Sequence, residues 1–185
     1  MSLGLRFFTM LWKLTVAVAV LCCLLSATNA AKPSVDVLGR WVGGKWAGEG
    51  KLVDSDYSKA MAVGGVTNCA WSPDHIFVIC DQSNTIDGKA TRDLSVYAFD
   101  PEKATYQMFG MSPGDKHPRT TELTISPDHS RWEYLGKAEI SGKQVQFRTV
   151  NIFRDNDHVD WWSEYSTDEG AHWARMGEGK ESRQK

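Results

Sequence analysis

The sequence lacks several patterns that would indicate a familiar chemistry. It has no G-x-S-x-G turn for a serine nucleophile, and no glycine loop followed by a helix that could hold a phosphate. Its five histidines form no H-x-H, H-E-x-x-H or H-x-x-x-H pair. The formal net charge of −2 gives no basic excess for nucleic acid. Serine hydrolysis, phosphate binding and nucleic-acid partners are therefore disfavoured, and no metal or other cofactor is predicted from these patterns.

The first 30 residues differ in composition from the rest. Arg6 and Lys13 are basic, residues 14–25 are apolar or small, and residues 26–30 are small enough for a signal peptidase. We therefore predict a signal peptide cleaved after Ala30 and a periplasmic or secreted protein without a stable membrane anchor. An uncleaved anchor is the alternative, but the clean apolar run is shorter than the roughly 20 residues that span a bilayer.

The remainder lacks sustained helical periods and is divided by turn residues into short β-favouring runs. We expect a lead at 31–43 with a short helical turn, a β-domain at 44–179 and a polar tail at 180–185. The ten expected strands are Lys45–Val53, Met61–Trp71, Ile76–Asp81, Asp93–Phe99, Thr105–Met111, Thr120–Ser126, Arg131–Lys137, Gln144–Phe153, His158–Ser166 and Ala171–Gly177. Short links favour antiparallel neighbours, and faces that mix polar with aromatic residues favour a closed barrel over a sandwich.

Two cysteines remain after the predicted leader. Cys69 and Cys80 flank a turn between two β-favouring runs, and an oxidising compartment would let them pair. We expect a disulfide across this hairpin, with two buried free thiols as the alternative. Their separation suits neither a CxxC redox motif nor a zinc knuckle, so either role is structural.

The first expected strand is rich in glycine. Within Gly43–Gly50, Gly44-Lys45-Trp46 has the G-x-W form and resembles the start of the calycin superfamily, which contains lipocalin and nitrobindin-like barrels. The resemblance implies a single up-and-down meander barrel. It also implies that a late basic residue, Arg175, packs over Trp46 and closes one end. The alternative is a core tryptophan with a solvated arginine.

Further segments narrow the resemblance. The leader, Cys69 followed by Trp-Ser-Pro-Asp, and Val96–Pro101 together resemble a bacterial family of exported calycin-like barrels that is catalogued as a domain of unknown function. That family implies no known activity. Nitrobindin-like barrels bind haem through a histidine near the C-terminus, which makes His172 an alternative haem ligand. His172 itself stands in a segment, Ser166–Trp173, that resembles an Asp-box turn.

The late strands offer candidate ligand-binding side chains. Trp161 and Tyr165 alternate with Trp162 and Glu164, so the two pairs lie on opposite faces of the strand. Because both faces carry large aromatic residues, the sequence does not decide which face points into the barrel. The binding hypothesis is a pocket for a small amphipathic or aromatic molecule, with Arg148 or Glu164 orienting its polar end. The alternative is a filled core with exterior aromatics.

Small-molecule binding is thus the leading function. A cavity-based isomerase or hydrolase using Glu164, His158 or Arg148 is one alternative. An envelope protein-interaction module is another, and it would require an exposed aromatic patch. The sequence carries no signal for an oligomeric state.

Overall fold

The computed structural model describes residues 33–185, and the predicted signal peptide lies outside this range. A 3₁₀ helix, η1 (Val35–Trp41), is followed by ten strands. These are β1 (Lys45–Leu52), β2 (Met61–Trp71), β3 (Phe77–Ile86), β4 (Lys89–Asp100), β5 (Thr105–Met111), β6 (Arg119–Ile125), β7 (Arg131–Ile140), β8 (Lys143–Phe153), β9 (His158–Ser166) and β10 (Ala174–Gln184). The predicted all-β architecture with a short helical lead is confirmed.

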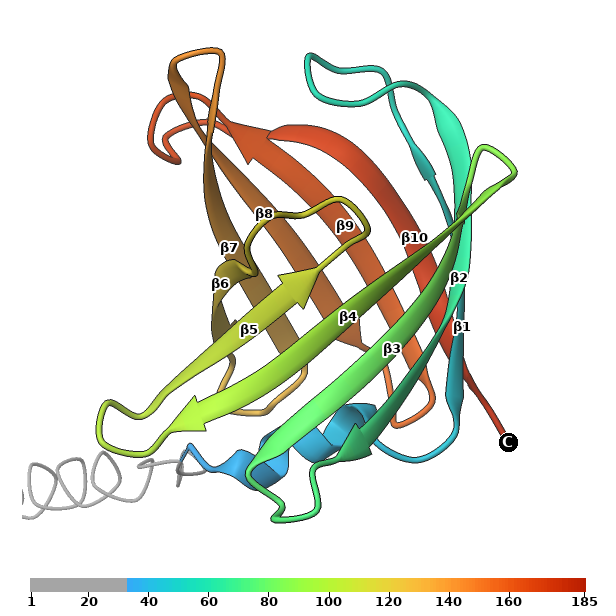
Figure 1. The fold of residues 1–185 in the computed structure, drawn as a ribbon, viewed down its shortest axis with the longest axis vertical. Coiled ribbons are helices and arrows are strands. Elements are labelled where there is room, and N and C mark those ends of the chain that lie inside the picture. Colours follow the sequence, from blue (N-terminus) through green and yellow to red (C-terminus); the bar gives the residue numbers. More distant parts are fainter. Residues whose placement is uncertain (1–32) are drawn as a thin grey trace, which may run out of the picture. The chain divides into compact units, whose positions relative to one another are not determined.

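The strands form one closed antiparallel barrel in which each strand pairs with its neighbour in sequence (Figure 1). β1 and β10 close it, with pairs running from Lys45↔Gln184 to Leu52↔Gly177. β10 therefore continues well beyond the expected strand end at 177 and the expected domain boundary at 179. Residues 180–184 are a paired strand and not a polar tail, because β1 needs a partner along its whole length.

Two hairpins are built on the same Ser-Pro-Asp-His turn. In each, the serine hydroxyl donates a hydrogen bond of 2.5 Å to the aspartate two residues later. The hydroxyl also accepts the backbone N–H five residues on, from Phe77 in one hairpin and Arg131 in the other. The histidine that ends each turn has a positive φ, 61° at His75 and 59° at His129. Local hydrogen bonding thus fixes the turns that join β2 to β3 and β6 to β7.

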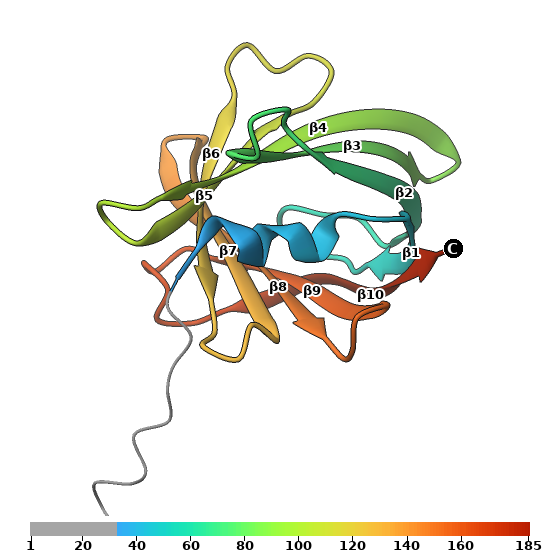
Figure 2. The same ribbon diagram turned by 90° about the horizontal axis from the view of Figure 1, so that it is seen from below.

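Helix η1 lies across one end of the barrel, as the view from below shows (Figure 2). Its Trp41 packs edge-on against Trp46 at 5.0 Å and against Phe153 at 5.1 Å between ring centroids. Trp132 joins the same cluster, 5.4 Å from Phe153. The Trp46 indole N–H donates to the Trp41 carbonyl at 3.0 Å. We call these four rings, Trp41, Trp46, Trp132 and Phe153, the aromatic floor.

The expected disulfide between Cys69 and Cys80 is present. The two residues are direct partners in the β2–β3 register, with their Cα atoms 4.1 Å apart. Both side chains are buried in the same cluster as the aromatic floor. The bond therefore fixes two adjacent strands where they meet the closed end.

Candidate ligand site in the barrel lumen

Burial identifies the inner face of the late strands. On β9, Val159 is 1% exposed and belongs to the core cluster. Because side chains alternate along a strand, Trp161 and Tyr165 share its face and point into the barrel. Trp162 and Glu164 point outward. We call the interior between the aromatic floor and the opposite mouth the lumen; several side chains along it, including Trp161 and Tyr165, keep partial exposure.

The floor is sealed by Arg183 and not by Arg175. The Arg183 guanidinium carbon lies 4.4 Å from the Trp46 ring centroid, and the two residues are register partners. Its N–H groups donate to the carbonyls of Val42 at 2.7 Å and Arg40 at 2.8 Å. The resemblance correctly implied a late basic residue over Trp46, but the wrong arginine was assigned because β10 is shifted toward the C-terminus.

Glu181 is the ionisable group that β10 turns into the lumen. It lies two residues from Arg183 and therefore on the same inner face. Its register partners are Gly48 on β1 and Val159 on β9, neither of which offers a polar side chain. Within residues 33–185, no side chain forms a hydrogen bond or ion pair with its carboxylate. Burial raises the pKa of Glu181 to about 7.

A glycine makes room for this glutamate. A Cβ atom at Gly48 would lie 3.0 Å from the Glu181 Cγ atom, closer than ordinary packing allows. Larger side chains at 48 would therefore displace the glutamate. The glycines of the first strand thus leave space on its inner face for the Glu181 side chain.

Two tyrosines face Glu181 from other walls. Tyr97 on β4 and Tyr134 on β7 are 5% and 7% exposed, and their ring centroids are 6.3 Å apart. Burial raises the pKa of both phenols, and the nearby Glu181 charge raises both further. The Tyr97 hydroxyl and the Trp41 indole N–H lie close enough to the Tyr134 hydroxyl to shift its pKa by hydrogen bonding, although neither contact is an ideal hydrogen bond. The three groups therefore form a loosely bonded polar cluster in the interior.

Trp161 covers a bare part of the wall. A Cβ atom at Gly50 or at Gly179 would lie 2.6 Å from its ring, so the ring occupies the space that side chains would need. Glycine on both β1 and β10 is therefore required for Trp161 to lie against the backbone. The indole remains partly exposed and presents an aromatic surface one row above Glu181.

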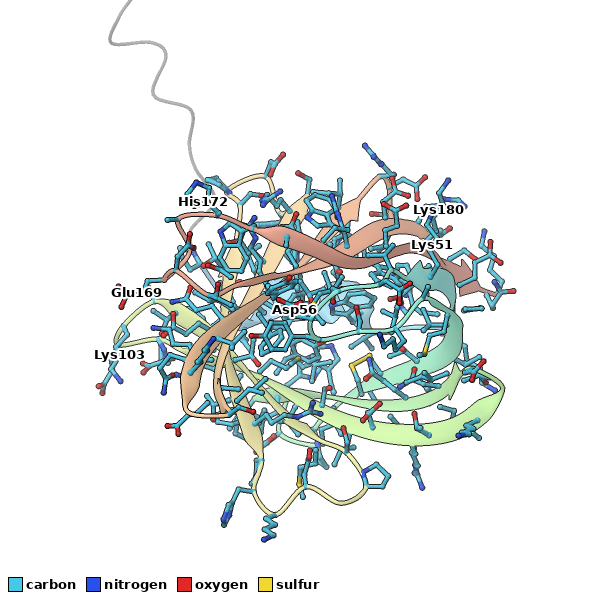
Figure 3. The ribbon with its side chains drawn as sticks, turned by 90° about the horizontal axis from the view of Figure 1, so that it is seen from above. Lys51, Asp56, Lys103, Glu169, His172 and Lys180 are labelled. Atoms are coloured by element: carbon cyan, nitrogen blue, oxygen red, sulfur yellow. A yellow bond between two sulfur atoms is a disulfide. The ribbon has the colours of Figure 1, made fainter. Side chains whose placement is uncertain are left out.

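The mouth of the lumen is crossed by the β1–β2 connection, residues 53–60. Its Tyr57 packs edge-on against Tyr165 at 4.6 Å and Phe147 at 5.7 Å, both on the inner face. Seen from above, Asp56 of the same loop lies over the middle of the barrel (Figure 3). The Ser55 hydroxyl accepts the backbone N–H groups of Tyr57 and Ser58, which gives the loop a defined shape.

Arg148 and Glu164 do not line the lumen with Trp161. They lie on the outer face, where the Arg148 Nη2 atom is 2.7 Å from the Glu164 Oε2 atom. Trp173 covers this ion pair, with the Arg148 guanidinium 4.1 Å from its ring. The expectation that either residue orients a ligand inside the barrel is therefore corrected. Their charges satisfy each other, which accounts for their burial on the outside.

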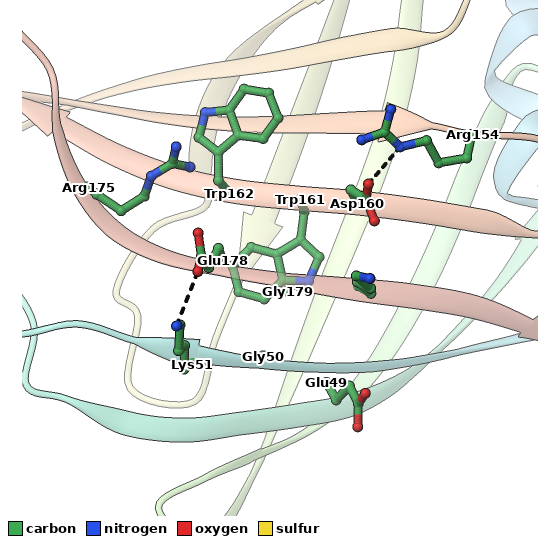
Figure 4. A pocket seen from close by; sticks show the side chains of 11 residues that line it. Glu49, Gly50, Lys51, Arg154, Asp160, Trp161, Trp162, Arg175, Glu178 and Gly179 are labelled. Carbon is green, nitrogen blue, oxygen red and sulfur yellow. Dashed lines mark hydrogen bonds and ion pairs between the residues drawn. The ribbon is translucent and has the colours of Figure 1, made fainter.

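Trp162 and Arg175 also lie outside, in a groove of about 570 Å³ over β9, β10 and β1 (Figure 4). The Arg175 guanidinium is 5.2 Å from the Trp162 ring centroid. The other charged groups are mostly paired: Lys51 with Glu178 at 3.2 Å, and Arg154 with Asp160 at 2.6 Å. Of the five residues proposed from the sequence, Tyr165 faces the lumen and Arg148, Trp162 and Glu164 lie outside, whereas Trp161 points inward and also lines this groove beside Gly50 and Gly179.

His172 lies away from the lumen. The His172 side chain is 91% exposed in the β9–β10 turn, and its Nδ1 atom is 2.6 Å from an Asp168 oxygen. His172 lies at the rim in Figure 3. This position does not fit a haem ligand inside the barrel. Within the described range, no three potential ligands gather into a metal site, and no helix is long and apolar enough to cross a membrane.

Sequence reasoning missed Glu181, Tyr97 and Tyr134. Glu181 lies in the predicted polar tail, and Gly177 and Gly179 just before it hide the alternation of inward and outward side chains. The signal that could have found it is the two-residue spacing from Gly177 to Arg183, which continues the inner face. Tyr97 lies inward because the neighbouring Val96 and Ala98 face out, which an alternating pattern alone leaves undecided.

The lumen has the groups for hydrogen bonding and proton exchange. A carboxyl whose pKa is near neutral can exist in both states at physiological pH. The two phenols offer donors and acceptors beside it, and Trp161 offers an apolar face. This combination can hold the polar end of a small molecule while an aromatic surface contacts its body.

Comparisons with known proteins support the fold. No protein-family model matches the chain, and no curated protein matches its sequence. Among solved structures, the S-type phycobiliprotein lyase CpeS from Guillardia theta is similar, with 12% identity, a TM-score of 0.58, and coverage of 84% of this chain and 95% of that one. Rv2717c from M. tuberculosis gives 13% identity, a TM-score of 0.57, and coverage of 83% and 98%. At these identities the likeness establishes the fold alone, that of a closed antiparallel β-barrel.

Proposed function

We propose that the protein binds a small amphipathic or aromatic molecule in the lumen and does so after export. The observation that carries this proposal is the Glu181 carboxyl in the lumen, with which no side chain of residues 33–185 forms a hydrogen bond or ion pair, beside the buried phenols of Tyr97 and Tyr134. A ligand would supply the missing hydrogen bonds, since leaving such groups unpaired costs about 1–3 kcal/mol each.

The apolar part of the ligand would lie against the upper lumen. The Trp161 ring lies on the inner face against glycines on β1 and β10, and Tyr57 with Tyr165 lines the mouth above it. An aromatic or amphipathic body fits these surfaces because ring faces favour stacked or edge-on contacts. The polar end of the ligand would then point toward Glu181.

Export and family membership belong to the proposal. The leader at 1–30 and the Cys69–Cys80 disulfide support an oxidising compartment, periplasmic or extracellular. The G-x-W start and the motifs that follow it support membership of the exported calycin-like family of unknown function.

The experiment is a fluorescence titration with N-phenyl-1-naphthylamine, an uncharged aromatic probe, on the protein without its leader. We expect enhanced probe fluorescence that saturates. Trp161→Ala should weaken binding by about tenfold, since it removes the exposed ring. Trp162→Ala is the matched control because this neighbour lies on the outer face. Absence of binding, or loss of binding on removing Trp162 instead, would contradict the proposal.

A second candidate function is acid–base catalysis in the same lumen. The pKa of Glu181, raised to about 7, suits proton transfer near neutral pH. Glu164, His158 and Arg148, which the sequence suggested for an enzyme, lie outside the lumen. Turnover of a bound ligand that Glu181→Gln abolishes, without loss of binding, would favour this candidate over simple binding.

A further inference from the structure

The charges around the lumen are unbalanced. Glu181 faces Gly48 on β1 and Val159 on β9, and Tyr97 and Tyr134 from the other walls. None of these groups is a cation. Arg119 on the inner face of β6 is bonded to Ser112 and lies 3.3 Å from Asp115. None of the residues that face Glu181 therefore supplies its carboxylate with a counter-charge.

The nearest cation on the same face of β10 is already committed. Arg183 donates to carbonyls of the η1–β1 connection and lies 3.2 Å from Asp157. It also covers Trp46. These contacts hold its guanidinium at the closed end, so it cannot serve both the floor and Glu181.

The other acid on the inner face is different. Asp93 on β4 accepts a hydrogen bond from the Asn84 amide at 2.5 Å and another from the Ser112 hydroxyl. Its oxygens are therefore satisfied within the wall. Of these two acids, only Glu181 has no hydrogen-bond donor within the described residues.

Aromatic rings surround this carboxylate. Tyr97 and Tyr134 share the inner face and lie close enough for the Glu181 charge to raise the pKa of both phenols, and Trp161 lies on the neighbouring inner row of β9. Ring faces attract cations through their quadrupole, and a carboxylate among such rings is suited to a protonated amine. The oxygen of the Tyr134 hydroxyl can accept a hydrogen bond from an N–H of such an amine.

From this arrangement we infer that the lumen selects ligands that carry a protonated amine, which ion-pairs with Glu181 between the rings of Tyr97, Tyr134 and Trp161. The inference rests on the proposed function and specifies the ligand class. An anionic ligand such as a fatty acid would meet a like charge, and a neutral one would leave the carboxylate unpaired.

The test uses three dansyl probes with the same fluorophore: one with a pentyl amine, one with a matched alkyl carboxylate and one neutral alkyl amide. We expect the amine to bind about tenfold more tightly than the amide, and the carboxylate more weakly than both. Glu181→Gln should remove the preference for the amine. Glu178→Gln should keep it, because that residue is on the same strand but faces outward.

The pH dependence gives a second readout. Amine affinity should rise about tenfold between about pH 5.5 and about pH 8.5, as the carboxyl ionises, and should stay flat in Glu181→Gln. Equal affinity for the three probes, or an amine affinity that Glu181→Gln leaves unchanged, would overturn this inference alone. Binding of none of the three would overturn the proposed function as well.

Discussion

The aromatic floor and the lumen above it belong to one barrel, but the two charged side chains that β10 directs inward have opposite surroundings. At the floor, the Arg183 guanidinium packs on the Trp46 ring, donates hydrogen bonds to backbone carbonyls and forms an ion pair with Asp157. In the lumen, Glu181 lies on the same strand two residues away and has no partner within the described range. Arg183 therefore contributes to the stability of the fold, whereas the charged form of Glu181 lowers it.

This difference teaches where function is to be sought in a barrel. A closed end is packed at the density of a protein core, so its residues are explained by the fold. A carboxyl that faces the interior without a bonded side chain, such as Glu181, is not explained by packing, because burial of an unpaired acid costs stability. The comparison can be tested by changing each region separately.

The largest expected effect is at the floor. Trp46→Ala removes a fully buried ring and its hydrogen bond, so it should lower the free energy of unfolding by about 3–5 kcal/mol. Trp161→Ala should cost less than about 2 kcal/mol, since that ring is partly exposed. Urea unfolding of both variants measures the contrast. Equal losses would break the comparison, because the lumen would then be packed like the floor.

The next effect concerns Glu181 and pH. Its folded pKa of about 7 is above the ordinary 4.5, so the folded state binds the proton more tightly. Wild-type stability should therefore fall as pH rises from 4.5 to about 7, by at most about 3 kcal/mol. Glu181→Gln should remove this fall and be more stable than wild type above neutral pH.

Urea unfolding at acidic and alkaline pH measures this prediction. Glu178→Gln serves as the control because Glu178 is exposed and faces Lys51 outside. A stability gain in Glu181→Gln that is the same at both pH values would show that ionisation of this carboxyl carries no penalty.

The disulfide should separate stability from binding. Replacing Cys69 and Cys80 with alanine opens a loop with a sequence separation of 11 and should cost about 3 kcal/mol. Probe affinity in the remaining folded protein should not change, because the bond lies beside the floor. Chemical denaturation and the probe titration together check this, and a parallel loss of affinity would argue that the two regions are coupled.

The smallest effect distinguishes two arginines. Arg183→Lys loses several directed hydrogen bonds to carbonyls and should cost about 1–2 kcal/mol. Arg175→Lys should change stability by less than about 0.5 kcal/mol, since that side chain is 42% exposed. Near-ultraviolet circular dichroism of the floor tryptophans provides an independent readout. The reverse ranking would restore the pairing of Trp46 with Arg175.

The ten strands could be predicted because turn residues and alternation are local properties. Ser72–His75 and Ser126–His129 carry their turn chemistry within four residues, and the disulfide pair flanks the first of them. The floor arginine could not be predicted in the same way, since its choice depends on the register between β1 and β10. That register is set by closure of the whole barrel.

The site was only partly predictable for the same reason. Alternation placed Trp161 and Trp162 on opposite faces, but the inward face is decided by which residues join the core. Glu181 could not be recognised because Gly177 and Gly179 interrupt the alternating pattern of β10. Glycine is needed at 179 because the Trp161 ring occupies the space of a side chain there. The glycines that make space in the lumen are thus also the residues that obscure the alternating pattern of the strand.

Closure by β1 and β10 also imposes an order on folding. The Trp46↔Arg183 pair joins the first strand to the last, so the entropy of a very long loop is lost before that contact is gained. Until β10 docks, β1 and β9 each expose an unpaired edge that could recruit another chain. Nine strands can assemble as a sheet with two open edges, and loss of β10 should therefore make the chain prone to aggregation.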